Sequence, residues 1–178
     1  MAVLTEARTA LPAGTWTLDP VHSRIGFELP YLAGSFRGQF AEIEAKLTGT
    51  TLTGTARVTS VDVKDENLSA HLQSPEFFDA ERHPELSFES RDLERSGDDL
   101  VVRGELTIRG ITKPVELDGK IAGPITDAYG RERINLNVST SVDRTDFGLN
   151  WNMPLPNGEP ALANEVKLVA ELYLVQEA

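Results

Sequence analysis

Apolar and polar residues alternate with the two-residue period of a β-strand along most of this chain. The alternation is strict over residues 134–138. Over residues 165–176 it places apolar side chains on one face, at Val166, Leu168, Ala170, Leu172 and Leu174. Shorter segments with strand patterns, separated by turn residues, lie at 16–18, 25–29, 54–58, 61–63, 86–88, 100–108 and 113–121. The pattern predicts an antiparallel, all-β protein.

Turn and breaker residues add detail to this pattern. Residues 35–47 are predicted to form one long or bulged strand, because their apolar positions do not alternate strictly and Gly38 marks a bulge. The Gly-Asp-Asp sequence at 97–99 predicts a hairpin turn. Gly123-Pro124 predicts the start of a loop.

One segment departs from the strand pattern. Leu68 and Leu72 are four residues apart and therefore share one face of a helix. Pro75 is predicted to end that helix, since the residue before a proline is pushed out of the α region. Two adjacent phenylalanines follow in a polar-flanked stretch. We expect a short helical insertion near residues 65–80 that closes one end of a β-barrel holding an apolar ligand.

The number of predicted strands favours a closed barrel. A sheet with this many strands would expose its edges unless it closed, so we prefer a barrel to a sandwich. At 178 residues, with no linker or low-complexity stretch inside residues 15–176, the chain is predicted to form one domain. Residues 1–14, which end in Pro-Ala-Gly, are expected to be a flexible N-terminal arm, and residues 15–178 the barrel domain.

Composition narrows the choice of partner and compartment. The formal net charge of −11 and the isoelectric point near 4.7 argue against nucleic acid, which needs a basic surface, and against docking on anionic lipid by charge alone. The absence of cysteine excludes disulfides and thiolate chemistry. The first 14 residues contain no apolar run, and no stretch of about 18 apolar residues occurs. We therefore expect a cytoplasmic protein without an integral membrane segment.

Asp19, His22 and Ser23 lie close together in the sequence and invite comparison with a catalytic triad. No nucleophile elbow accompanies them, and we expect Asp19 and His22 to form a hydrogen bond within a turn. The chain has three histidines, His22, His71 and His83, and they lack the spacing of a metal-binding motif. The sequence therefore predicts no catalytic residue, no metal and no cofactor.

Residues 143–151 are denser in candidate chemistry. Arg144 stands between two aspartates, one of them Asp146, and close to Phe147 and Trp151. An arginine suits a phosphate or a carboxylate through its bidentate fork. The segment therefore either holds the polar head of a ligand against an aromatic wall or forms a salt-bridged corner between a strand and a loop. Both interpretations stay open on the sequence alone.

Five segments together resemble the YceI-like family. They are Trp-Thr-Leu-Asp-Pro-Val-His-Ser at 16–23, Ser-Ala-His-Leu-Gln-Ser-Pro-Glu-Phe-Phe-Asp at 69–79, His-Pro-Glu-Leu-Ser-Phe-Glu-Ser at 83–90, Gly-Glu-Leu-Thr-Ile-Arg-Gly-Ile-Thr-Lys-Pro-Val at 104–115 and Arg-Thr-Asp-Phe-Gly at 144–148. The resemblance implies an extended, lipocalin-like antiparallel β-barrel with a helical insertion and a long apolar tunnel. It also implies binding of a polyisoprenoid or another long-chain amphiphile without catalysis.

We therefore expect a protein that carries or stores a polyisoprenoid, an isoprenoid quinone or a similar lipid, with a second copy of the chain as a further partner in a homodimer. The residues expected to bind the lipid or shape the tunnel mouth are Phe27, Phe36, Phe40, Leu72, Phe77, Phe78, Phe88, Trp151, Met153, His22, Arg144 and Asp146. Leu72 and the adjacent phenylalanines are expected to cap the tunnel. Two alternatives remain open. One is an enzyme acting on a lipid-like substrate with His22 or His71 as base, and the other is a solid-cored barrel that binds a partner.

Overall fold

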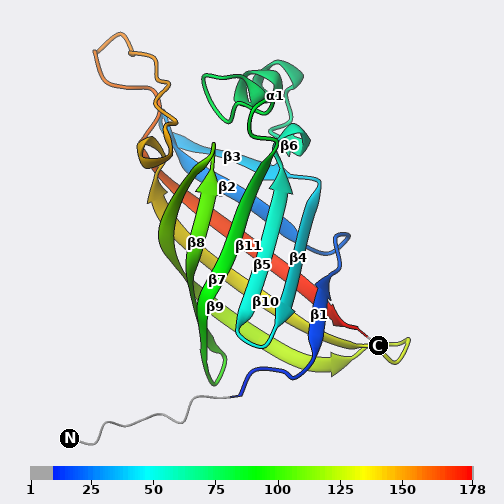
Figure 1. Ribbon diagram of the computed structural model, residues 1–178. Coiled ribbons are helices and arrows are strands. Elements are labelled where there is room, and N and C mark those ends of the chain that lie inside the picture. The colour runs from blue at the N-terminus through cyan, green and yellow to red at the C-terminus, as the bar shows by residue number, and fades with distance from the viewer. Residues whose placement is uncertain (1–9, 178) are drawn as a thin grey trace, which may run out of the picture.

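The computed structural model describes residues 10–177. Within that range, eight antiparallel strands close into a barrel, and one short α-helix, α1, lies over one end of it (Figure 1). The all-β barrel with a helical insertion, expected from the sequence, is therefore confirmed. Residues 1–9 of the predicted N-terminal arm lie outside the described residues.

Three of the eight barrel strands are interrupted and carry two labels each. Strand β1 continues into β2, β3 into β4 and β5 into β6. The strands and helices of the described residues are β1 (Thr15–Leu18), β2 (Arg24–Tyr31), β3 (Gly34–Phe40), β4 (Ile43–Thr48), β5 (Thr51–Arg57), the 3-10 helix η1 (Val58–Ser60), β6 (Val61–Asp62), α1 (Glu66–Gln73), β7 (Glu85–Ser96), β8 (Asp99–Ile108), β9 (Ile111–Thr126), β10 (Glu132–Asp143), the 3-10 helix η2 (Arg144–Phe147) and β11 (Glu165–Gln176).

Strand β11 closes the barrel because it pairs with both parts of the first interrupted strand. Trp16 of β1 lies opposite Gln176, and Glu28 of β2 lies opposite Lys167. On the other side, β1 pairs with β4 and β2 pairs with β3. The sheet therefore stays closed on both sides of the interruption at residues 19–23, and closure removes the long edges that an open sheet would expose.

The prediction of a single strand over residues 35–47 is wrong in one respect. In the structure the strand is interrupted after Phe40 and resumes at Ile43. The bulge expected at Gly38 does not occur, since residues 34–40 pair with β2 in an unbroken register. Gly38 has a different role. A Cβ at this position would collide with the ring of Phe27, so the glycine leaves room for that ring.

The prediction that a loop starts at Gly123-Pro124 is also wrong, because β9 continues through this dipeptide to Thr126. The register between β9 and β10 shifts between Arg133 and Asn135, opposite this dipeptide. Proline has no backbone N–H to give to the sheet, and a local irregularity of this kind accommodates it without ending the strand.

Helix α1 begins and ends where its sequence predicts. Asp65 precedes the helix, and its side chain accepts a hydrogen bond of 3.0 Å from the backbone N–H of Leu68. Ser74 follows the helix with φ −73° and ψ 165°, which is the extended conformation expected before Pro75. Among residues 10–177, no helix has the length and apolar character that crossing a membrane requires.

The apolar interior divides into two clusters of buried side chains. We call the first the closed end; it consists of Trp16, Ala45, Leu47, Leu52, Leu93, Leu100, Val102, Ile121, Ile134, Leu136, Val138, Leu172 and Leu174. We call the second the open end; it lies towards α1 and consists of Phe27, Leu29, Phe40, Ile43, Ala56, Val58, Val61, Leu72, Phe77, Phe78, Leu86, Ile108, Phe147, Leu149 and Val166. All the buried phenylalanines of the described residues belong to the open end.

Candidate ligand-binding cavity

The open end contains a cavity of about 330 Å³. Nine of the residues predicted from the sequence line it: Phe27, Phe36, Phe40, Leu72, Phe77, Phe78, Arg144, Trp151 and Met153. The lining is almost entirely apolar, and its volume lies at the lower end of the range found for small-molecule sites. The structure therefore brings most of the predicted residues to one place.

A second, smaller cavity of about 130 Å³ lies deeper in the barrel. Both cavities are lined by Phe40, Leu86, Ile108 and Leu168, so these side chains lie at the boundary between them. Phe88, which was predicted to line the tunnel, borders this second cavity and not the first. The empty space thus runs from the mouth of the barrel towards the closed end.

The wall of the larger cavity is built on Phe27 of β2. Its ring centroid lies 6.3 Å from that of Phe36, 5.9 Å from that of Phe40 and 6.2 Å from that of Phe78. Such tilted and edge-on contacts are the favoured geometries of aromatic pairs. Rings held in this way are stiff and do not collapse into the space beside them.

The segment after α1 covers the cavity, and we call residues 74–80 the cap. Its backbone folds back on the helix, because the N–H of Phe78 donates to the carbonyl of Leu72 and the N–H of Ala80 donates to that of Gln73, each at 2.9 Å. These bonds direct Phe77 and Phe78 towards the barrel interior, where both are buried.

Arg109 connects the cap to two other segments at the mouth. It occupies the two-residue turn between β8 and β9, with φ 55°, in the left-handed region that a two-residue hairpin of this kind requires. Its guanidinium donates to the carbonyl of Pro75 at 2.8 Å and also to the carbonyl of Gly148. One side chain therefore fastens the cap and the loop after η2 to the barrel.

A polar group stands among aromatic rings at the mouth. The ring of His71 meets those of Phe77 and Trp151 edge-on, with centroids 4.9 Å and 5.0 Å away. His71 Nε2 lies 2.6 Å from Glu76 Oε2. His71 lines the cavity, so it is the histidine of the enzyme hypothesis that a bound ligand would meet.

Arg144 is buried, although it carries a charge. Its guanidinium donates to the carbonyls of Leu149 at 2.6 Å, Trp151 at 2.8 Å and Ala163 at 2.9 Å. Burial lowers the pKa of Arg144, and the nearby Asp143 carboxylate opposes that effect. The corner interpretation is the one that this geometry fits, with backbone carbonyls in place of the expected carboxylates. Asp146 is exposed and does not border either cavity.

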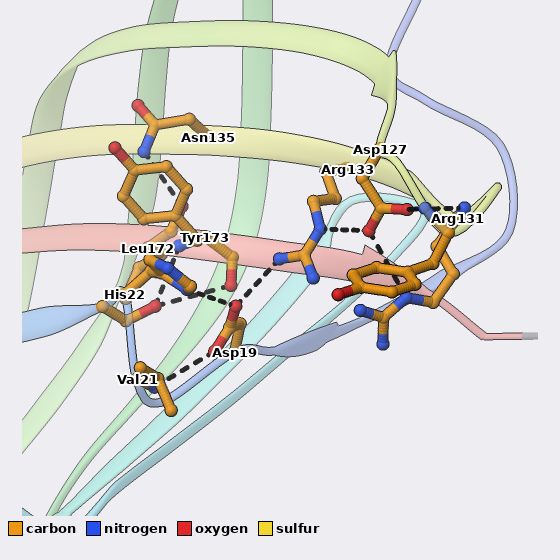
Figure 2. A network of polar contacts seen from close by, with 11 residues as sticks. Asp19, Val21, His22, Asp127, Arg131, Arg133, Asn135, Leu172 and Tyr173 are labelled. Atoms are coloured by element: carbon orange, nitrogen blue, oxygen red, sulfur yellow. Dashed lines mark hydrogen bonds and ion pairs between the residues drawn. The ribbon is translucent and has the colours of Figure 1, made fainter.

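His22 lies away from both cavities, in a polar network on the outside of the barrel (Figure 2). Its Nδ1 is 2.7 Å from Asp19 Oδ2, which confirms the hydrogen bond predicted within this turn. Asp19 also accepts from Arg133 at 2.8 Å, and Arg133 donates to Asp127 at 2.6 Å. Figure 2 shows how these contacts tie the interruption after β1 to the start of β10.

Residues 16–174 match the YceI-like domain. The chain belongs to the YceI-like family. A UPF0312 protein of Pectobacterium atrosepticum is 30% identical over 162 residues, which are 86% of this chain and 84% of the relative. The protein YceI of an Escherichia coli strain is 29% identical over 164 residues, which are 88% of this chain and 83% of that one.

Solved structures of other proteins share the barrel. A polyisoprenoid-binding domain from Saccharophagus degradans, implicated in plant cell wall breakdown, superposes with a TM-score of 0.69 at 11% identity, and covers 91% of this chain and 98% of its own. BcnA of Burkholderia cenocepacia superposes with a TM-score of 0.74 at 19% identity, over 90% of this chain and 99% of its own. These similarities confirm the fold.

Several residues of this YceI-like cavity were not predicted from the sequence. The additional lining residues include Leu29, Tyr31, Leu68, Ile108, Leu149 and Leu162. Residues 148–164 connect η2 to β11 and have no strand or helix period, so periodicity gives no inward face there. Apolar residues within a loop rich in Pro and Asn are the signal that was available, since solvated loops seldom need them.

Proposed function

We propose that this barrel binds a long-chain apolar amphiphile, such as a polyisoprenoid or an isoprenoid quinone, in the open end, and carries or stores it without catalysis. The observation that carries the proposal is a 330 Å³ cavity with an almost entirely apolar lining, at one end of a barrel whose other end holds a cluster of buried, mainly aliphatic side chains. The polyisoprenoid-binding domain of Saccharophagus degradans, which has the same fold, supports the choice of ligand class.

The energetics favour an apolar chain. Each methylene group moved from water into such a cavity contributes about 0.8 kcal/mol, so a few isoprene units suffice for tight binding. The chain would follow the cavity past Phe40 towards the smaller space below it. Its polar end would stay at the mouth beside His71, while Arg144 would shape the mouth through the loop carbonyls that it binds.

Solvent extraction of the purified protein followed by mass spectrometry tests the proposal first. We expect a long-chain lipid or quinone in a ratio of about one per chain, as for one site per barrel. If the extract is empty, the protein is incubated with a polyprenol and with an isoprenoid quinone, and binding is measured by calorimetry. Failure to bind either compound would refute the proposal.

Two neighbouring positions on β10 provide a matched pair of variants. Val142 lines the cavity, and Ser141 is exposed, because successive side chains of a strand point to opposite faces. In Val142→Trp the indole occupies ligand space, and we expect affinity to fall at least about tenfold, which corresponds to about 1.4 kcal/mol or two methylene groups. Ser141→Trp adds the same ring outside and should bind as the unmodified protein does.

A second candidate function has one observation in its favour. The 2.6 Å contact between His71 and Glu76 at the cavity mouth resembles a base held by a carboxylate. If the protein turns over a lipid-like substrate, His71→Ala should abolish turnover and retain binding. If His71→Ala changes only affinity, the enzyme hypothesis is rejected. The third hypothesis, a solid-cored barrel, disagrees with the two cavities.

A further inference from the structure

Apolar side chains at the mouth of the cavity face outward as well as inward. Leu32 is 63% exposed, Met153 is 55% exposed and Tyr31 is 41% exposed. Tyr31 and Met153 also line the cavity, so the exposed apolar surface continues into the interior. Tyr31 forms a bridge with Leu162, which brings the turn between β2 and β3 beside the loop before β11.

The loop before β11 contains a hairpin that projects beyond the barrel strands (Figure 1, orange). Ala161 N–H donates to the carbonyl of Met153 at 2.9 Å, and Leu155 N–H donates to that of Glu159 at 2.8 Å. We call this hairpin, residues 153–161, together with Tyr31 and Leu32, the apolar rim. Glu159 is its only charged side chain.

The hairpin is suited to a medium that is poor in water. Three of its nine residues are prolines, at 154, 156 and 160, and have no backbone N–H. The N–H groups of Leu155 and Ala161 are used in the hydrogen bonds between its two arms. A backbone group without a partner is costly away from water, so a segment with few free donors can enter such a medium at low cost.

Leu32 gives independent evidence for contact with an apolar surface. Its φ of 52° lies in the left-handed region, which glycine and asparagine adopt more readily than leucine. Its side chain is also the most exposed of the large apolar residues at the mouth. The two-residue turn between β2 and β3 calls for this backbone conformation, as the turn at Arg109 does, but it does not call for leucine. A large apolar side chain is exposed to water at a position where glycine or asparagine would serve the turn.

We propose that the apolar rim docks on the surface of a neutral phospholipid bilayer, so that the mouth of the cavity opens towards the membrane. This inference rests on the proposed function, because it names where a long-chain cargo enters and leaves. The net charge of −11 disfavours an anionic membrane. The hairpin of the rim also projects beyond the barrel strands (Figure 1), whereas a stable interface between two proteins needs a surface of about 800 Å² on each partner. A bilayer accepts a small apolar projection.

Flotation with phosphatidylcholine vesicles tests the docking. We expect the unmodified protein to float with the vesicles and Leu32→Asp to lose association at least about tenfold, since an apolar contact is replaced by a charge. Aspartate tolerates a left-handed backbone better than leucine, so this substitution should not harm the fold. Ile125→Asp is the matched control. Ile125 is 68% exposed on β9, at the other end of the barrel, and its substitution should leave flotation unchanged.

Cargo content, measured by extraction from each variant, separates this inference from the proposed function. Leu32 does not line the cavity, so Leu32→Asp should keep its cargo while losing the vesicles. Flotation of Leu32→Asp equal to that of the unmodified protein would overturn the docking, whatever the cargo. So would a preference for vesicles containing phosphatidylglycerol, or a dimer that Leu32→Asp separates while neither protein floats. An empty cavity in every protein would instead count against the proposed function.

Discussion

The two ends of the barrel are built from the same strands but with different side chains. At the closed end, leucine, isoleucine and valine side chains from opposite walls pack against one another, and Leu47, Leu136 and Leu174 have no exposed surface. The smaller cavity, which reaches Leu52 and Val138, enters this cluster. At the open end, phenylalanine rings meet edge-on and leave a cavity. Interdigitated aliphatic side chains reach the density of a protein interior, whereas the side chains of the open end enclose an empty space. One barrel thus separates stability from binding along its axis.

Trp16 seals the closed end. Its side chain is almost fully buried among the residues of the closed end, and its indole N–H donates to the carbonyl of Ala13 at 3.2 Å. The polar edge of the ring is therefore satisfied while the apolar part fills the barrel. At the open end the cap performs the covering role, but it is fastened by a few hydrogen bonds and by Arg109. We therefore expect the cap, and not the closed end, to open first.

A pair of leucine truncations should produce the largest difference between the ends. Leu136→Ala removes a side chain that is fully enclosed, and we expect a loss of about 2–5 kcal/mol in the free energy of unfolding. Leu29→Ala removes a side chain that borders the cavity and has fewer contacts to lose, so we expect only about 1–2 kcal/mol. Denaturant titrations of both variants measure these values.

Ligand affinity should change in the opposite order. Leu29→Ala should weaken binding, because Leu29 lines the cavity, and Leu136→Ala should bind as the unmodified protein does at temperatures where it is folded. Equal losses of stability, or a ligand effect confined to Leu136→Ala, would show that the two ends do not divide these tasks.

Features that depend on local periodicity could be predicted from the sequence. Strand β11 spans 165–176 as expected, because a strand buried on one face must alternate. Helix α1 ends just before Pro75, because a proline forces the residue before it, here Ser74, out of the α conformation. The phenylalanines at 27, 36 and 40 line the cavity because they belong to inward faces of paired strands. The fold and the phenylalanines of the cavity wall therefore follow from the sequence.

Features that depend on contacts between distant segments could not be predicted. Arg109 looks like an ordinary turn residue, and only the folded chain brings Pro75 and Gly148 within its reach. Phe88 has the correct inward direction, but its depth in the barrel, and so its cavity, depends on the register of β7 with its neighbours. Periodicity gives the face of a side chain and not its height along the barrel axis.

Removing the clamp at the mouth should have an intermediate effect. Arg109→Ala removes the hydrogen bonds to the carbonyls of Pro75 and Gly148, and we expect stability to fall by about 1–2 kcal/mol. Ligand dissociation should accelerate up to about tenfold, because the cap opens more often. Stopped-flow release and amide hydrogen exchange of residues 74–80 measure both effects.

Arg95→Ala is the control for the clamp. Arg95 donates to the carbonyl of Gly97 at 2.8 Å, in the turn between β7 and β8 at the closed end. The variant loses a comparable contact between an arginine and a turn carbonyl, but ligand release should not change. If both arginine variants release ligand at the same rate, Arg109 does not control the cap.

The smallest effect is expected from the polar network outside the barrel. Burial of Asp19 opposes its ionisation, but hydrogen bonds from Arg133 and His22 outweigh this and lower its pKa to about 2. An unfolded aspartate has a pKa of about 3.9, so between these values the unfolded chain binds more protons and the stability from Asp19 is lost as pH falls. Asp19→Asn should therefore cost under about 1 kcal/mol at pH 7, as expected for a partly exposed ion pair.

The cost of Asp19→Asn should decrease towards zero as the pH falls from about 4 to about 2, because the unmodified protein loses the same contribution there. Denaturant titrations at pH 7 and at about pH 2.5 test this, with Asp118→Asn, an exposed aspartate on β9, as the control. Ligand affinity should not change in either variant, since neither residue borders a cavity. A cost that stays constant with pH would mean that Asp19 acts through shape and not through charge. A change in affinity would mean that this network, although outside the barrel, contributes to the open end.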